Sequence, residues 1–413
     1  MRSIALFVFG LVALGSYGQQ QATVGHLLIA DSIQKQGVWE NEALLVNRIF
    51  TDSYHKWNGD SIVNTLLPAI FRERDSLVEA QPDAALKATV TYYYANGIFD
   101  LSNAMVFKLK RRETWKIIAD TMALTTPFPS MKTLAGDPMA NSYLDNLINH
   151  ELRELFIRSR EQGDSVFLSA FGIGVDSLKS LALRRGETYL TIPLSARKFP
   201  PYAHERYLAN QLLMNVEKKD LILAEAVWQE LVDHYPRSGY LKDCSAALDK
   251  QRAALSAGTK NPDIVFLENL DTLKSIEKLI EPFDGKVVYL DIWGTWCGPC
   301  VRELSQYTAA LKQRFEGRDD LIFLYVATDS DSDHQKWEQF VRLHLITGYH
   351  ARFTDQAMEP LWIDLDLLAT RDVPRTYPTY AIFDREGQLV TADAKRPSQG
   401  EALYLQLEEA LTK

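Results

Sequence analysis

Two cysteines with two residues between them stand where an apolar run ends and a helical pattern begins. The run covers residues 286–293, and its β-branched and aromatic side chains predict a buried strand. After Cys300 the apolar residues recur at spacings of three and four, which predicts a helix. These residues are Leu304, Tyr307, Leu311 and Phe315. The pair is therefore expected on a strand-to-helix turn, with Cys297 at or next to the first helical position.

The position of the two cysteines favours redox chemistry. The N-terminus of a helix offers unpaired N–H groups and the positive end of the helix dipole, and both stabilise a thiolate. The thiolate is the nucleophile in disulfide exchange. With two residues between the sulfurs, one helical turn can close a Cys297–Cys300 disulfide and open it again. The sequence therefore predicts a redox-active dithiol.

Two other uses of such a pair are weaker. Zinc needs four ligands, and neither Cys244, far upstream, nor His334 completes a set with a zinc spacing. A purely structural disulfide would close too short a loop to remove much entropy from the unfolded chain. We therefore expect neither a metal nor another cofactor.

Length and charge narrow the possible classes of function. A chain of 413 residues suggests two domains, or at most three. The net charge of −9 is modest and no long basic block is present, so nucleic-acid binding and a polybasic membrane patch find no support.

The first 18 residues have the features of a signal peptide. Arg2 supplies a positive charge and residues 4–14 a short apolar stretch. Ser16 and Gly18 are small residues at the two positions that a signal peptidase reads, which predicts cleavage before Gln19. The apolar stretch is shorter than the roughly 20 residues that span a bilayer. We expect an exported, soluble mature chain without a transmembrane segment. Its odd cysteine, Cys244, is expected to be a buried core thiol, with a resolving or intermolecular role as the alternative.

The rest of the chain divides into two parts. Residues 19–258 are predicted to be a mainly helical domain of unknown role, with a helical hairpin over 221–248, and residues 253–261 are the expected linker. In residues 259–413 strand and helix patterns alternate, which predicts an α/β domain. The later elements expected there are strands over 321–327, 350–353, 379–383 and 388–392, helices over 334–345 and 360–368, and a last helix that opens with the capping-box spacing of Ser398 and Glu401.

The cysteine turn carries a family resemblance. Trp296-Cys297-Gly298-Pro299-Cys300 resembles the active site of thioredoxin, and residues 261–413 are similar to the exported TlpA/ResA-like branch of that superfamily. The helix and strand expected between residues 331 and 354 match the insertion typical of this branch. The resemblance covers a little over a third of the chain. It implies an α/β thioredoxin-like fold, preceded by a mainly α-helical N-terminal domain.

The resemblance assigns roles to the residues of the turn. Cys297, nearer the helix end and more exposed, is expected to be the attacking thiol, and Cys300 the resolving thiol that releases the reduced substrate. Gly298 and Pro299 keep the turn tight, because a proline in the first helical turn loses no hydrogen bond. Trp296 completes the turn.

A carboxylate stands inside the apolar strand, six residues before Cys297. Burying Asp291 alone would be costly, and the resemblance implies that it is the buried proton acceptor for the resolving thiol. Burial should raise its pKa, which suits a general base near neutral pH. The alternative is that Asp291 lies on an edge strand and faces water.

A proline directly precedes the strand expected over 379–383. In the thioredoxin fold the proline at this place is cis and faces the cysteines, and the residue before it pairs through its backbone with the substrate peptide. The resemblance assigns these roles to Pro378 and Tyr377. Pro374 is the competing candidate, but only Pro378 leads directly into the strand.

Two features depart from the family pattern. Ser305 replaces the proline that usually kinks the catalytic helix, so a weaker bend is expected, and strand 321–327 offers no lysine to pair with Asp291. The acidic run after that strand resembles the start of a calcium loop but lacks its glycine and closing glutamate. Capping of the next helix by Asp331 or Asp333 is expected instead.

These features together predict an exported thiol–disulfide oxidoreductase. It would reduce or exchange disulfides in client proteins of a bacterial periplasm or cell envelope, and a membrane-borne electron donor would recharge it. A thiol peroxidase of the same fold is one alternative, although the sequence lacks the peroxiredoxin pattern Pro-x-x-x-Thr-x-x-Cys. The other alternative is a helical binding or assembly protein with an accessory redox domain.

Overall fold

The computed structural model describes residues 58–107, 112–268, 270, 273–370 and 372–412, together with position 45. The expected signal peptide lies outside these residues. The described chain forms two compact units. The helical unit comprises the described residues up to Met214 and Leu223–Cys244, and the α/β unit comprises Asn215–Ile222 and the described residues from Ser245 on.

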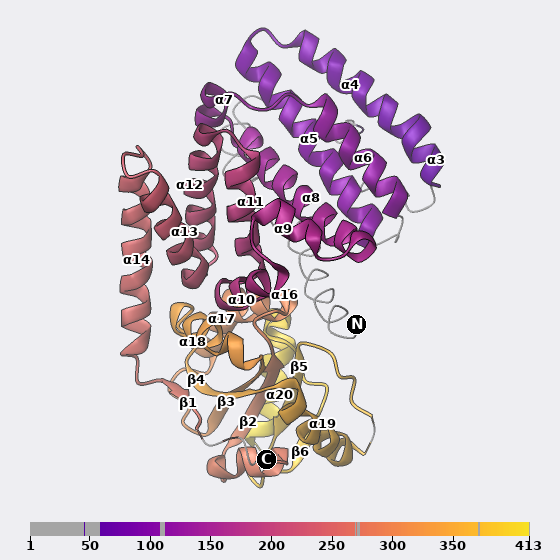
Figure 1. Cartoon of the computed structure of the whole chain (residues 1–413). Helices are drawn as coiled ribbons and strands as arrows, with labels where there is room; N and C mark the ends of the chain where they lie inside the picture. Colours follow the sequence, from indigo (N-terminus) through magenta and orange to yellow (C-terminus); the bar gives the residue numbers. More distant parts are fainter. Residues whose placement is uncertain are drawn as a thin grey trace. The chain divides into compact units, whose positions relative to one another are not determined.

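The helical unit is built from helices alone over the described ranges (Figure 1). Helix α5 packs against α4, α6 and α8, because Val90, Tyr94 and Ile98 recur every four residues on a buried face. Its elements are α3 (Gly59–Ser61), η2 (Ile62–Leu66), α4 (Leu67–Ala80), α5 (Ala84–Phe107), α6 (Arg112–Thr125), α7 (Met131–Gly136), α8 (Pro138–Gln162), α9 (Ser165–Phe171), α10 (Val175–Arg185), η3 (Glu187–Leu190), α11 (Thr191–Lys198), α12 (Pro201–Glu217) and α13 (Leu221–His234).

Across the residues with described structure, no single helix has the length and apolar character needed to cross a membrane. By length and composition alone, α9 and α10 taken together meet that test, with a bend of 65° between them.

The α/β unit contains a six-stranded sheet with the order β1-β4-β3-β2-β5-β6. Strands β1, β4, β3 and β2 are parallel, whereas β5 is antiparallel to β2 and β6 is antiparallel to β5. The strands are β1 (Ile264–Phe266), β2 (Val287–Trp293), β3 (Leu321–Thr328), β4 (Gly348–Phe353), β5 (Thr379–Phe383) and β6 (Leu389–Thr391). Strand β2, which leads into the cysteine turn, therefore lies inside the sheet between β3 and β5.

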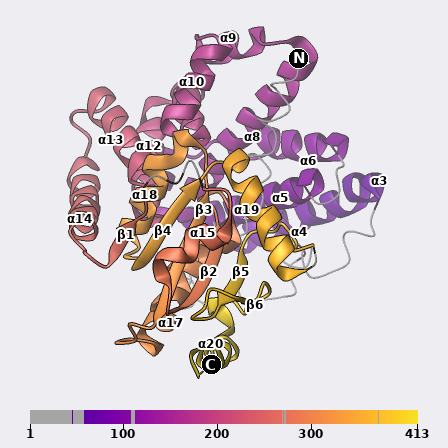
Figure 2. The ribbon, with the colours of Figure 1, turned by 90° about the horizontal axis from the view of Figure 1, so that it is seen from below.

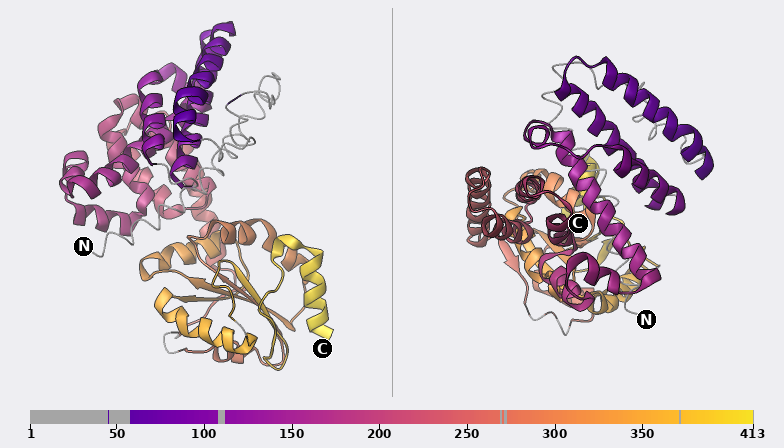
Figure 3. Two further views of the ribbon diagram at one scale, coloured as in Figure 1. Left: turned by 90° about the vertical axis from the view of Figure 1, so that its right-hand side faces the viewer. Right: turned by 45° about the horizontal axis from the view of Figure 1, so that its top comes forward.

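Helices cover both faces of this sheet (Figures 2 and 3). Side chains of β2 alternate between the two faces, so that Tyr289 and Trp293 belong to one core and Leu290 and Ile292 to the other. The catalytic face, as we name the first, is covered by α16 (Gly298–Arg302), η6 (Glu303–Tyr307), α17 (Thr308–Arg314), α18 (His334–Leu343) and α20 (Glu401–Thr412). The opposite face is covered by α15 (Ile276–Ile280), η5 (Glu281–Phe283) and α19 (Asp355–Ala369), and the short η7 (Asp331–Asp333) and η8 (Pro397–Gln399) precede α18 and α20.

Several element boundaries differ from the sequence predictions. Helix α14 (Leu241–Thr259) continues through most of the expected linker. Strand β1 was not predicted, because three residues are too few to show a period. Helix α19 begins at Asp355, well before the predicted start at residue 360, because the Thr354 side chain accepts a hydrogen bond from the Ala357 N–H and caps it. Pro360 consequently lies inside the helix.

The capping predictions for the acidic run are wrong. Asp333 occupies the N-cap position of α18, but its side chain makes no capping hydrogen bond. Its carboxylate accepts from the Ser330 hydroxyl instead, at 2.5 Å. Asp331 accepts from the Arg352 guanidinium at 2.9 Å. Both carboxylates therefore accept hydrogen bonds from these side chains and not from the backbone N–H groups at the start of α18.

The capping box predicted at Ser398 is also absent. At the start of η8 the Gln399 Oε1 atom accepts instead from the Arg396 N–H, at 3.0 Å. Ser398 turns its hydroxyl and its backbone N–H toward Glu303, at 2.6 and 2.8 Å. A buried carboxylate accepts strongly, which accounts for the change of partner.

The helix that follows the cysteines is irregular in spite of Ser305. A π turn, η6, separates α16 from α17, and Ser305 lies at its centre. The Thr308 hydroxyl donates to the Glu303 carbonyl at 3.3 Å, five residues back, and so supports the wider turn. Helix axes commonly bend at such turns. The π turn is another source of a bend, and the expectation that this bend is weaker than in the family stays a prediction.

Candidate active site

The two cysteines form a disulfide at the start of α16. Cys297 is the N-cap residue, and its sulfur accepts a hydrogen bond from the Cys300 N–H at 3.2 Å. Their Cα atoms are 5.2 Å apart. The attacking sulfur predicted from the sequence thus lies at the positive end of the helix dipole, where a thiolate would also be stabilised.

The surface of the turn is unevenly exposed. Cys297 is 5% exposed and Cys300 only 1%, whereas the Trp296 side chain beside them is 46% exposed. The Trp296 indole N–H donates to the Thr328 carbonyl at 2.7 Å. Its ring centroid lies 4.8 Å from that of Tyr377. An incoming group would therefore meet an aromatic pair next to the less buried sulfur.

The peptide bond between Tyr377 and Pro378 is cis, as the resemblance implied. It leads into β5, where Thr379 pairs with Ile292 of β2, close to the strand end that carries the cysteine turn. Among the residues that the structure describes, nothing accepts from the Tyr377 N–H or donates to its carbonyl. These two groups are available to an extended peptide.

Asp291 is buried in the middle of the sheet, with 1% exposure. Its register partners are Tyr325 on β3 and Tyr380 on β5. Over the described part of the chain, its Oδ1 atom has no hydrogen-bond partner. Burial, and secondarily the charge of Glu303, hold the pKa of Asp291 well above its usual range. The alternative of a water-facing residue on an edge strand is therefore wrong.

No lysine of β3 faces Asp291, but a lysine reaches the catalytic face from α17. The Lys312 Nζ atom lies 3.7 Å from the ring centroid of Phe323 and 5.6 Å from that of Tyr325. Burial lowers the pKa of Lys312 to about 7. The sequence pattern missed this residue, because a lone lysine in a helix is usually solvent-exposed.

Glu303 is a second buried carboxylate on the catalytic face, which sequence reasoning missed. It is 5% exposed and is held by the two hydrogen bonds from Ser398. Its partner is 95 residues away in the sequence, so no local pattern could have revealed the contact.

Asp329 anchors the residue that precedes the Trp-Cys pair. Its carboxylate accepts from the Thr295 N–H at 3.1 Å and from the Thr295 hydroxyl at 2.7 Å. Burial raises the pKa of Asp329 to about 6, against the opposing effect of these hydrogen bonds. One signal was present in the sequence. Asp329 directly follows β3, whose carboxyl end lies at the same sheet edge as that of the parallel β2.

Two further points concern the third cysteine, Cys244, and possible metal ligands. Cys244 is fully buried in the helical unit, and burial raises the pKa of its thiol to about 11, which makes it a poor nucleophile. In the part of the chain that the structure covers, no group of three or more His, Cys, Asp or Glu side chains could hold a metal.

A disulfide that caps a helix, a neighbouring cis-proline and a buried aspartate in this mixed sheet define a class of protein. They are the features of thioredoxin-like thiol–disulfide oxidoreductases.

Comparison with known proteins agrees with this class. Residues 256–405 match the family model described as Redoxin. Thiol-disulfide oxidoreductase ResA of Bacillus thuringiensis subsp. konkukian is 30% identical over 145 residues, which cover 34% of this chain and 69% of that protein. The chain therefore belongs to the family of ResA-type thiol-disulfide oxidoreductases.

Two further matches are shorter or weaker. ResA of Geobacillus kaustophilus is 41% identical over 54 residues, and the match covers 13% of this chain and 29% of the Geobacillus protein. The thioredoxin domain of a thiol-disulfide oxidoreductase from Bacteroides vulgatus is 20% identical, with a TM-score of 0.26, over 32% of this chain and 82% of that one.

Proposed function

We propose that this chain is exported and reduces or exchanges disulfides in client proteins of a bacterial cell envelope, with Cys297 as the attacking and Cys300 as the resolving thiol. The observation that carries the proposal is the Cys297–Cys300 disulfide at the N-terminus of α16. The unpaired backbone groups of Tyr377 support a polypeptide substrate.

The reaction would proceed in two exchanges. The Cys297 thiolate attacks one sulfur of a client disulfide, and the other client sulfur leaves as a thiolate and takes up a proton. The Cys300 thiol gives its proton to Asp291, and its thiolate attacks the Cys297 sulfur. The Cys297–Cys300 disulfide forms, and the second client thiolate leaves and is protonated. The client gains two electrons and two protons, and the dithiol loses them.

The resting disulfide must then be reduced again by a thiol donor, which we propose is carried by the membrane. Two electrons and two protons pass from the donor dithiol to the Cys297–Cys300 pair. Support for export comes from Arg2, the apolar residues 4–14 and the small residues Ser16 and Gly18. Fractionation of cells that make the full chain, followed by N-terminal sequencing, tests this part. A cytoplasmic chain that keeps its first 18 residues would overturn it.

Trapping of mixed disulfides tests the roles of the two cysteines. Cys300→Ser should accumulate clients linked to Cys297, because the resolving thiol is gone. Cys297→Ser should accumulate none, and Cys244→Ser serves as the control that resolves clients normally. Client adducts that form on Cys300 in the Cys297→Ser variant would reverse the assignment.

Selective alkylation of the reduced protein tests the same assignment without a client. The pKa of the Cys297 thiol should be about 7 or below, the value typical of thioredoxin. In the reduced protein at neutral pH, mass spectrometry should find the label on Cys297 first. Preferential labelling of Cys300 would contradict the proposed order of attack.

A further inference from the structure

The helical unit contains a pocket of about 460 Å³ that the redox chemistry does not use. This volume is within the range of sites that bind small molecules or side chains. It lies among α8, α9 and α11. Its polar lining consists of Arg158, Gln162, Ser165, Ser169, Arg197 and Lys198, and its other lining residues are apolar. We name it the basic pocket.

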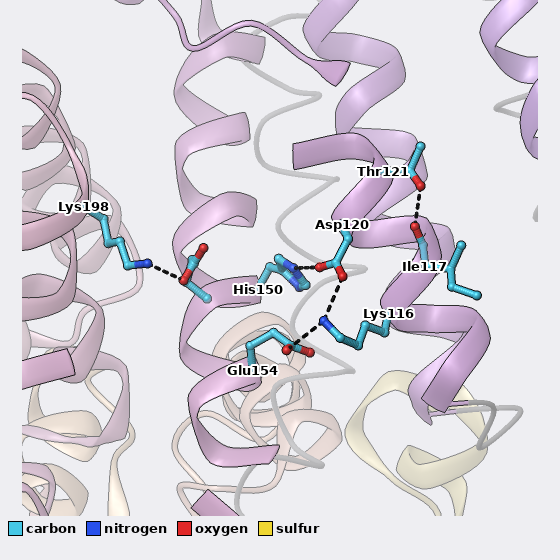
Figure 4. Close-up of polar contacts among 8 residues, drawn as sticks. Lys116, Ile117, Asp120, Thr121, His150, Glu154 and Lys198 are labelled. Carbon is cyan, nitrogen blue, oxygen red and sulfur yellow. Dashed lines mark hydrogen bonds and ion pairs between the residues drawn. The ribbon is translucent and has the colours of Figure 1, made fainter. Parts of the chain in front are cut away.

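The positive charge of this lining is not neutralised by any carboxylate that lines the pocket. Three of the lining side chains are cationic and none is a carboxylate. The nearby acids of α8 are already engaged, since Glu151 pairs with Lys198 at 2.8 Å and Glu154 with Lys116 at 3.1 Å (Figure 4). Glu161, further along α8, is exposed and does not line the pocket.

Two guanidinium groups of the basic pocket remain unpaired. Over the described residues, neither Arg158 nor Arg197 makes a hydrogen bond or an ion pair. The Arg158 Nε atom is moreover buried, so it has lost water without gaining a partner. A buried polar group without a partner is costly unless a ligand satisfies it.

The position of Arg197 depends on a glycine. Gly172 ends α9 with a φ of +75°, and a Cβ at this residue would collide with the Arg197 Nη2 atom. A residue without a side chain therefore leaves the space into which the guanidinium extends. Arg158 on α8 and Arg197 on α11 reach the same pocket from different helices.

We propose that the basic pocket binds an anionic group, a carboxylate or a phosphate, between the guanidinium groups of Arg158 and Arg197. The planar fork of arginine matches both groups with paired N–H donors. Gln162, Ser165 and Ser169 supply further donors around the anion. The group belongs either to a small anion or to an acidic side chain of a bound protein, and both sources share this chemistry.

Calorimetric titration of the full mature chain tests the proposal with two probes, inorganic phosphate and an acetylated glutamate-rich peptide. At least one probe should bind with one site per chain, and less tightly as the salt concentration rises. Arg158→Gln and Arg197→Gln should each raise the Kd at least about tenfold, because each removes charge-assisted hydrogen bonds. Binding of phosphate alone identifies a small anion as the source, and binding of the peptide alone identifies a protein.

Arg160→Gln is the matched control, because Arg160 lies on the same helix, is exposed and does not line the pocket. Its Kd should equal that of the unchanged chain. Arg197 is itself exposed, so Arg197→Gln carries the test if Arg158→Gln does not fold. The Cys297→Ser chain should bind equally well, which separates this site from the redox proposal. Absence of binding by both probes, or an equal loss in Arg160→Gln, would overturn the inference.

Discussion

At the scale of single residues, the catalytic face combines a buried acid with groups that do not neutralise it. Asp291 faces tyrosines on both neighbouring strands, and the nearest carboxylate to influence it is Glu303. Burial, and secondarily the charge of Glu303, favour the protonated acid over the carboxylate. A residue held in this way would give its proton to a departing client thiolate, and the carboxylate so formed would then take up the proton of the Cys300 thiol.

Asp291→Asn should raise stability at neutral pH and slow the resolving step. The pKa of Asp291 is raised in the folded chain, so its stabilising contribution is complete below the unfolded value and is lost as the pH rises. At pH 8 the free energy of unfolding should increase by at least about 1.4 kcal/mol, and at pH 3 it should hardly change. Insulin reduction at pH 7 should slow at least about tenfold.

Chemical denaturation at both pH values and a rate profile from pH 6 to 9 measure these effects. The exposed Asp319→Asn provides a control with the same change of charge. Rates for Asp291→Asn that match those of the control across this range would remove Asp291 from the mechanism.

Asp329→Asn should remove a pH dependence of stability. The pKa of Asp329 is raised from 3.8 to about 6, so its contribution is complete at pH 3 and declines as the pH rises through 4 to 6. The difference of about 2 between these two pKa values is equivalent to about 3 kcal/mol of unfolding free energy. The variant should therefore gain up to this amount relative to the unchanged chain between pH 4 and pH 7. A difference in unfolding free energy that is constant over this interval would contradict the assignment.

At the scale of elements, helices α14 and α18 approach each other so closely that the addition of one methyl group tests the contact. Gly258 in α14 lies against the backbone carbonyl of Arg342 in α18, and a Cβ at residue 258 would collide with that oxygen. Alanine normally stabilises a helix interior relative to glycine, by about 0.5–1 kcal/mol. Gly258→Ala should have the opposite sign and cost about 1–3 kcal/mol, because backbone atoms must move.

Urea denaturation followed by tryptophan fluorescence measures this cost. Gly136→Ala is the control, since Gly136 likewise lies in the last turn of a helix and a Cβ there would meet nothing within 4 Å. It should be neutral or stabilising. Equal effects of the two substitutions would show that α14 and α18 are not in close contact.

The elements also show how far local sequence patterns reach. The apolar run before the cysteines and the pattern after Pro378 predicted β2 and β5 correctly, because each side-chain period is complete within a few residues. The contacts of Glu303 with Ser398 and of Asp329 with Thr295 join residues that are 95 and 34 positions apart. No local period encodes such pairs. They arise only when the sheet and its helices are assembled.

At the scale of the whole molecule, the redox chemistry lies within one of the two units. Cys297, Cys300, Asp291 and Pro378 all belong to the α/β unit. A fragment from Ser245 to the C-terminus should therefore reduce a small aromatic disulfide at a rate within about twofold of the full mature chain. Activity on a native client should fall further, if the helical unit selects clients.

Stopped-flow measurement of the fragment and of the full mature chain, each with both substrates, checks this division. Circular dichroism first establishes that the fragment is folded. A folded fragment that is inert toward the small disulfide would mean that the helical unit completes the active site. A fragment that retains full activity on the client would instead remove client selection from the helical unit.

The π turn after the cysteines has a consequence for how this helix tolerates a change in its length. A π turn holds one residue more than an α-helical turn, so η6 is equivalent to a one-residue insertion in an ordinary helix. Deleting Ser305 would restore α-helical spacing and leave α17 facing the core as before, because the π turn absorbs the extra residue. Leu311 should stay in the core, so the Tm should change little, whereas deletion of a residue within the regular α17 should lower it strongly, since each deleted residue turns an α-helix by about 100°. An extra residue is thus one way in which a helix of this kind becomes irregular without a proline in the turn.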